Sequence, residues 1–150
     1  MIRRVILSLL LVAGPAFAAQ APKTYLLQDA ATATGGGTVA HAIGFIWATV
    51  QIVIPTGASP SAVLQFEQTL NRIHYTATLC RPLSGNARHS GVSITPANAS
   101  TADLHWRCDV SGAHGFRVNI TSYTGAGAIT VYAVLTSSGV AATMGGARWS

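Results

Sequence analysis

The feature that most constrains the fold is a strict alternation of apolar and polar residues in two neighbouring stretches, 116–121 and 129–135. Side chains of a β-strand point alternately to its two faces, so this period of two is typical of a strand with one buried face. The segment between them, 124–127, contains two glycines and has the length of a hairpin loop. The sequence therefore predicts an antiparallel hairpin with one face in solvent.

Gly- and Pro-rich turn signals separate shorter runs of the same period at 64–67, 75–79 and 104–110. In the run 43–54, most residues that would point to either face of a strand are apolar. This pattern predicts a strand that is covered on both sides. No helical period is visible beyond residue 18. We expect about eight strands and an all-β class: a single antiparallel two-sheet β-sandwich of jelly-roll type at 25–137, with Trp106 in its core. A closed barrel is the alternative.

The first 18 residues have the parts of a secretory signal peptide. Arg3 and Arg4 form a positive start, an apolar run follows, and Ala16-Phe17-Ala18 matches an A-x-A cleavage site. The apolar run breaks at Gly14-Pro15, too early for the roughly 20 residues that an uncleaved membrane anchor needs. We expect cleavage after residue 18 and no membrane span in the mature chain. The expected location is secreted, periplasmic or at the cell surface, including association with a particle.

Between the signal peptide and the sandwich we expect a short leader at 19–24, and after it a Gly-rich flexible tail at 138–150. Cleavage would remove two arginines and lower the formal charge from +5 to +3. The six remaining arginines are scattered along the sequence, at positions 72, 81, 88, 107, 117 and 148. A nucleic-acid partner is therefore not expected, because binding it needs a basic stripe with stacking aromatic residues.

Cys80 and Cys108 are the two cysteines of the chain. An exported chain reaches an oxidising compartment, where paired cysteines normally join. Two free thiols or a metal pair are the alternatives, but a zinc site needs four ligands at close spacing, and these two residues lie far apart in sequence. The sequence favours a disulfide between them.

The segment from Asp109 onward also carries a resemblance. DVSG, the run FRVNITSYT, a Gly-containing turn and AITV resemble the closing segment of a β-sandwich module of phage structural proteins and bacterial surface proteins. TATGGGTV at 32–39 is similar to the Gly-rich opening of that module, and AVLQFEQTLNRIHYTA at 62–77 to its central strand pair. Gln68-Thr69 and His74-Tyr75 depart from the usual Gly-Ser and Asn-Trp. The resemblance implies a structural role of virion or fibre type.

No catalytic or metal-binding motif is recognisable in the sequence. The histidines, at positions 41, 74, 89, 105 and 114, have no recognised metal-ligand spacing. The acids Asp29, Glu67, Asp103 and Asp109 could supply a glycosidase pair, but nothing in the sequence places two of them together. There is no G-x-S-x-G elbow. We therefore expect no enzyme activity, no cofactor and no metal.

The outer face of the predicted hairpin is the candidate binding surface. Its residues would be Arg117, Asn119, Tyr123, Thr130 and Tyr132, and an ordinary solvated sheet face is the alternative. Charged residues make up only 9% of the chain, which favours packed contact with neighbours. We expect an exported, non-enzymatic structural module that associates with itself or with another structural protein.

The rival hypothesis is a carbohydrate-binding module of the same sandwich class. It would bind glycans on that face or in loops at 81–91 and 96–101. The acceptor triplets for glycosylation that begin at Asn98 and Asn119 are interpreted as coincidental, because the signal peptide is of bacterial type.

Overall fold

The computed structural model describes residues 20–97 and 104–137. The expected signal peptide, the tail at 138–150 and the Asn98 triplet lie outside these residues. The part of the chain described consists of ten β-strands without a helix. They are β1 (Lys23–Ala31), β2 (Ala40–His41), β3 (Trp47–Val53), β4 (Ser59–Thr69), β5 (Thr76–Ala77), β6 (Cys80–Pro82), β7 (Gly91–Ile94), β8 (His105–Asp109), β9 (Gly115–Ala126) and β10 (Ile129–Thr136). The prediction of an all-β class is confirmed.

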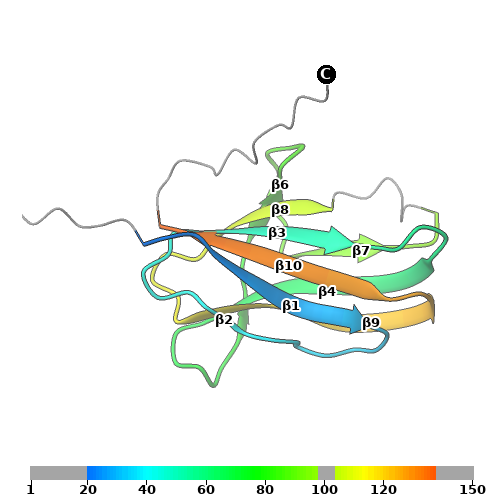
Figure 1. Cartoon of the computed structure of the whole chain (residues 1–150), viewed down its shortest axis with the longest axis horizontal. Coiled ribbons are helices and arrows are strands. Elements are labelled where there is room, and N and C mark those ends of the chain that lie inside the picture. The colour runs from blue at the N-terminus through cyan, green and yellow to red at the C-terminus, as the bar shows by residue number, and fades with distance from the viewer. Residues whose placement is uncertain (1–19, 98–103, 138–150) are drawn as a thin grey trace, which may run out of the picture.

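The strands form two antiparallel sheets of five strands that pack into a sandwich (Figure 1). Sheet A has the order β1-β10-β3-β8-β6, and its strands cross the view of Figure 1 in that order. Sheet B has the order β2-β9-β4, and both β5 and β7 pair with the edge of β4 that β9 leaves free. The architecture is a sandwich and not the closed barrel.

Strand pairing runs from the ends of the chain inward. β1 pairs with β10, β2 with β9, β3 with β8 and β4 with β7, and these pairs lie alternately in sheet A and sheet B. Such pairing is that of one long hairpin, with β5 and β6 near its tip, rolled up into two sheets. This arrangement is a jelly roll, as the sequence predicts, with two short strands added.

The predicted hairpin between β9 and β10 is wrong, although both strands exist. β9 pairs with β2 and β4 in sheet B, whereas β10 pairs with β1 and β3 in sheet A. The short connection between them therefore passes from one sheet to the other. Alternation identifies the buried side of a strand, but it carries no information about the partner strand.

The core lies between the two sheets and is built from the inward residues of both. Its largest fully buried side chains include Phe66, Leu64, Phe116 and Ile120 of sheet B, and Leu27, Ile52 and Leu135 of sheet A. Trp106 is 4% exposed, and its ring centroid lies 5.2 Å from that of Phe66. The prediction that Trp106 belongs to the core is confirmed.

The run 43–54 is covered less completely than its composition predicts. Within it, strand β3 buries Ala48, Val50 and Ile52, while Trp47 on the opposite face is only half-buried. The expectation of a strand covered on both sides is therefore wrong. The outer face of β3 receives only side chains from neighbouring strands, as no further layer of described residues packs on it.

Cys80 and Cys108 form the expected disulfide. They lie directly opposite each other on β6 and β8, with 4.3 Å between their Cα atoms. β6 thus occupies the start of the segment 81–91, which was predicted as a loop. The bond attaches this edge strand of sheet A to β8.

Candidate functional site

The predicted binding face is divided by the fold. Arg117 and Asn119 point outward from sheet B, while Thr130 and Tyr132 point outward from sheet A. The two outer faces lie on opposite sides of the sandwich. A single ligand therefore cannot rest on all of these residues at once, and each outer face must be considered separately.

Tyr123 belongs to neither outer face. Leu64 pairs with Ile120 but Val63 pairs with Ser122, so Thr121 is an extra residue that forms a β-bulge in β9. The bulge reverses which later residues of β9 face the core. Tyr123 consequently packs against the core, and its hydroxyl donates a hydrogen bond to the Gly127 carbonyl. The predicted outward position of Tyr123 is wrong for this reason.

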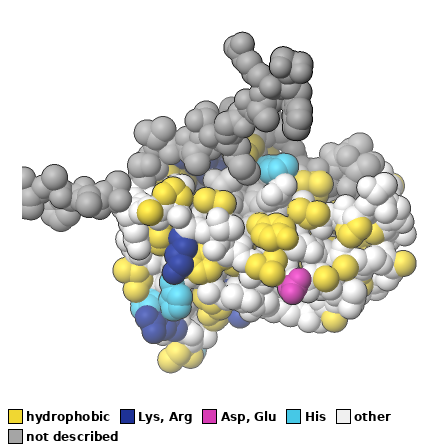
Figure 2. Space-filling model, in the orientation of Figure 1, with side chains coloured by type: hydrophobic (Ala, Val, Ile, Leu, Met, Phe, Trp, Pro, Cys, Tyr) yellow, Lys and Arg dark blue, Asp and Glu magenta, His cyan; other side chains and the backbone are white. Residues whose placement is uncertain are grey.

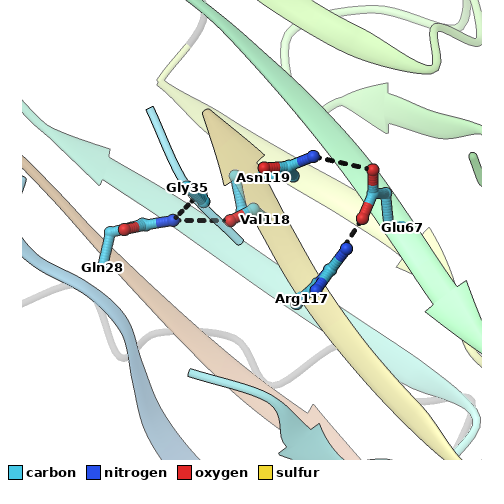
Figure 3. Close-up of polar contacts among 6 residues, drawn as sticks. All are labelled: Gln28, Gly35, Glu67, Arg117, Val118 and Asn119. Carbon is cyan, nitrogen blue, oxygen red and sulfur yellow. Dashed lines mark hydrogen bonds and ion pairs between the residues drawn. The ribbon is translucent and has the colours of Figure 1, made fainter. Parts of the chain in front are cut away.

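On the outer face of sheet B, a buried carboxylate joins two of the predicted site residues (Figure 3). Glu67 of β4 is 7% exposed. Its Oε2 atom lies 2.7 Å from Nε of Arg117, and its Oε1 accepts a hydrogen bond of 3.0 Å from Nδ2 of Asn119. The ring of Tyr75 covers the Arg117 guanidinium, with 3.6 Å from Cζ to the ring centroid. Arg117 and Asn119 are thus engaged within the sheet.

The glycine-rich segment 35–37 lies along the edge of β9 opposite β4 and contacts this cluster there. Gly35 forms an antiparallel bridge with Ile120. Nε2 of the buried Gln28 donates to the carbonyls of Gly35 and Val118 at 2.9 and 2.8 Å, and so joins the two sheets (Figure 3). A Cβ atom on Gly36 would lie 2.6 Å from Nη1 of Arg117. Glycine at position 36 therefore allows the backbone to approach the arginine.

Beyond the cluster, the same outer face has an open groove of about 770 Å³. Val63 of β4 and Leu79 contribute apolar side chains, at 42% and 54% exposure. The segment predicted as a glycan-binding loop at 81–91 contributes Arg88, His89 and Ser90. The lining of the groove therefore combines apolar and polar side chains. No tyrosine or tryptophan lines it, so it lacks the aromatic platform expected for stacking on sugars.

The outer face of sheet A has a different character. Leu26 of β1 and Tyr132 of β10 are directly opposite each other, at 38% and 40% exposure. Val53 of β3 is 37% exposed. It pairs with Thr130, which shares the outer face of β10 with Tyr132, so Val53 points to the same face. Figure 2 shows hydrophobic side chains gathered over β1 and β10, with Lys and Arg side chains mainly toward one end. Leu26 and Val53 were not recognised from the sequence, because strand alternation alone does not show that the two strands flank β10.

The acidic residues do not form a catalytic pair in the part of the chain described. Asp29 lies on β1 and Asp109 on β8, which β10 and β3 separate, while Glu67 belongs to the other sheet. Hydrogen bonds from the Ser111 hydroxyl and N–H lower the pKa of Asp109; burial acts in the opposite direction, and the charge of Arg88 lowers it further. No group of three or more His, Cys, Asp or Glu side chains suited to a metal ion occurs among residues 20–97 and 104–137.

The fold and these surfaces define a jelly-roll β-sandwich. One outer face is polar and grooved, and the other carries exposed apolar side chains on β1, β10 and β3. No protein-family model matches the chain, and no curated protein is similar to it in sequence. Among the described residues, no helix is long and apolar enough to cross a membrane.

Two solved structures share the fold. The SPBc2 prophage-derived protein YomS is similar with a TM-score of 0.64 and 19% sequence identity, over 89% of this chain and 99% of YomS. The PBSX exported protein XepA is similar with a TM-score of 0.64 and 16% identity, over 91% of this chain and 48% of XepA. The chain thus spans about half the length of XepA. At these identities the likeness is one of fold, and it supports the all-β sandwich expected from the sequence.

Proposed function

We propose that this protein is an exported, non-enzymatic structural module that assembles through the outer face of sheet A. Leu26, Val53 and Tyr132 on this face are the observation that carries the proposal. Protein interfaces are enriched in aromatic residues and poor in charge at their centres. The partner is a second copy of the chain or another structural protein of a particle, fibre or cell surface.

Export is supported by three independent features. The sequence predicts a signal peptide, and XepA is described as an exported protein. The Cys80–Cys108 disulfide is suited to an oxidising compartment, because cytosolic thiols are normally kept reduced. The expected location is therefore secreted, periplasmic or on the cell surface.

A structural role is also consistent with the contacts of two of the three described acidic residues. Glu67 is paired with Arg117 and Asn119, and Asp109 accepts hydrogen bonds from Ser111. Both carboxylates therefore contribute to structure.

The test is to replace Leu26 and Tyr132 together by serine and to measure association by sedimentation velocity and by co-sedimentation with particles from the producing culture. The expected result is a folded protein, by circular dichroism, that no longer associates. A matched control replaces Leu70 and Ile73 by serine. These two residues are 73% and 74% exposed in the loop after β4, so the control removes apolar surface elsewhere and should leave association unchanged.

Association that survives the Leu26/Tyr132 substitution would refute the proposal, as would a wild-type protein that is both monomeric and absent from particles. A glycan array distinguishes the rival function. Glycan binding by the monomeric wild-type protein would support a carbohydrate-binding module instead.

A further inference from the structure

Three arginines that are scattered in the sequence come together at the β6 edge of sheet A. Arg81 of β6 and Arg107 of β8 are directly opposite each other, so their side chains leave the same face of the sheet. Like charges in this position are normally destabilising. Arg88, in the segment after β6, lies close enough to the end of β8 to affect Asp109. The fold thus brings together arginines that are far apart in the sequence.

Two of these arginines, Arg81 and Arg88, line a small cleft. It has a volume of about 230 Å³ and is lined by Trp47, Leu79, Arg81, Asn86, Arg88 and Asp109. Arg107 lies over the Trp47 ring, with 4.2 Å from its Cζ atom to the ring centroid. Arg81 and Arg88 are both exposed. The cleft therefore has an indole ring, one face of which Arg107 covers, and two accessible guanidinium groups.

The hydrogen-bond donors that line the cleft outnumber its acceptors. Arg81 and Arg88 each carry five N–H donors, and Asn86 adds an amide. Nε1 of Trp47 is buried and has no hydrogen-bond partner in the part of the chain described. Asp109 is the one acidic residue in the lining, and one of its oxygens already accepts hydrogen bonds from Ser111. The cleft lining therefore has more donors than acceptors, and the charges of Arg81, Arg88 and Asp109 leave it with one net positive charge.

We propose that this cleft is a binding site for a carboxylate, such as an acidic side chain presented by a partner protein. A guanidinium group binds a planar carboxylate through two parallel hydrogen bonds. Asp109 offsets one of the two positive charges of Arg81 and Arg88. The cleft therefore favours a ligand with a single negative charge over a doubly charged sulfate or phosphate. This site lies at the β6 edge and is independent of the Leu26, Val53 and Tyr132 surface.

The test is a titration of the full disulfide-bonded protein with sodium acetate, followed by NMR of the arginine Nε–H signals, with sodium chloride at equal ionic strength as the reference. We expect saturable shifts for Arg81 and Arg88 in the millimolar range. Arg81→Gln and Arg88→Gln should each weaken acetate binding by up to about fivefold, as an exposed ion pair contributes up to about that factor. Asp109→Asn should strengthen binding, since it removes the competing charge and keeps an acceptor for Ser111.

Arg72→Gln is the matched control, because it removes one exposed arginine from the loop after β4, where Arg72 donates to the His114 ring. It should leave acetate affinity unchanged. Shifts that match those of chloride, or equal effects of Arg72→Gln and Arg81→Gln, would overturn the site and indicate general charge screening. Tighter binding of sulfate than of acetate would overturn the assignment to a carboxylate. Arg81→Lys keeps the positive charge but loses the planar guanidinium group. It replaces Arg81→Gln if the glutamine variant does not fold.

Discussion

The ion pair between Arg117 and Glu67 predicts an unequal response to removal of its two partners. The side chain of Glu67 is 10% exposed, whereas that of Arg117 is 24% exposed and stacks on Tyr75. Arg117→Met leaves a buried carboxylate with Asn119 as its remaining side-chain donor in Figure 3. Glu67→Gln instead leaves a guanidinium that water can reach. The arginine substitution should therefore be the more damaging of the two.

The expected losses in the free energy of unfolding can be estimated from these environments. Breaking a buried pair by removing one partner costs about 3–5 kcal/mol, and Arg117→Met should fall near the lower end because Asn119 still donates to Glu67. Glu67→Gln should cost about 1 kcal/mol, since the amide oxygen can still accept one hydrogen bond. Replacing both residues by apolar ones, Glu67→Leu with Arg117→Met, should recover most of the loss, because no charge is then left buried.

Urea unfolding at neutral pH, followed by circular dichroism, measures these differences. The denaturant slope should stay constant across the four proteins, so that a shift in midpoint reports stability alone. A loss for Glu67→Gln equal to or greater than that for Arg117→Met would refute the asymmetry. A loss below about 0.5 kcal/mol for Arg117→Met would mean that solvent screens the pair and that the cluster does not stabilise the sheet.

Two further predictions concern the core and the edge of sheet A. Replacing Cys80 and Cys108 by serine should lower the free energy of unfolding by about 3–4 kcal/mol. The reason is that the bond joins residues separated by 28 positions and so restricts the unfolded chain. An unchanged urea midpoint would contradict this prediction. Trp106→Ala should cost about 3–5 kcal/mol because it leaves a cavity beside Phe66. Tyr132→Ala, at a side chain that is 40% exposed, should cost far less, and equal losses in thermal or urea unfolding would show that the two positions are wrongly assigned.

The properties that depend on residues close together in the chain could be predicted from the sequence. Alternation identified the inward residues of β9 up to Ile120 and those of β10, because a strand turns its side chains to opposite faces whatever it pairs with. The number of cysteines and the expected export were enough to predict the disulfide. The position of Trp106 followed from the same alternation in β8. The all-β class and the sandwich therefore required no knowledge of the partner strands.

The pairing of the strands, and the surfaces that result from it, could not be predicted in this way and are known from the fold. β9 and β10 follow each other along the chain, yet each pairs with strands that are distant in sequence, because the rolled hairpin buries both sheets against one core. The bulge at Thr121 reversed the orientation of Tyr123, and such a bulge depends on the register with β4. The cleft at Arg81 and Arg88 exists because β6 pairs with β8. Contacts of this kind depend on positions that are close in space and far apart in sequence, so a local pattern cannot encode them.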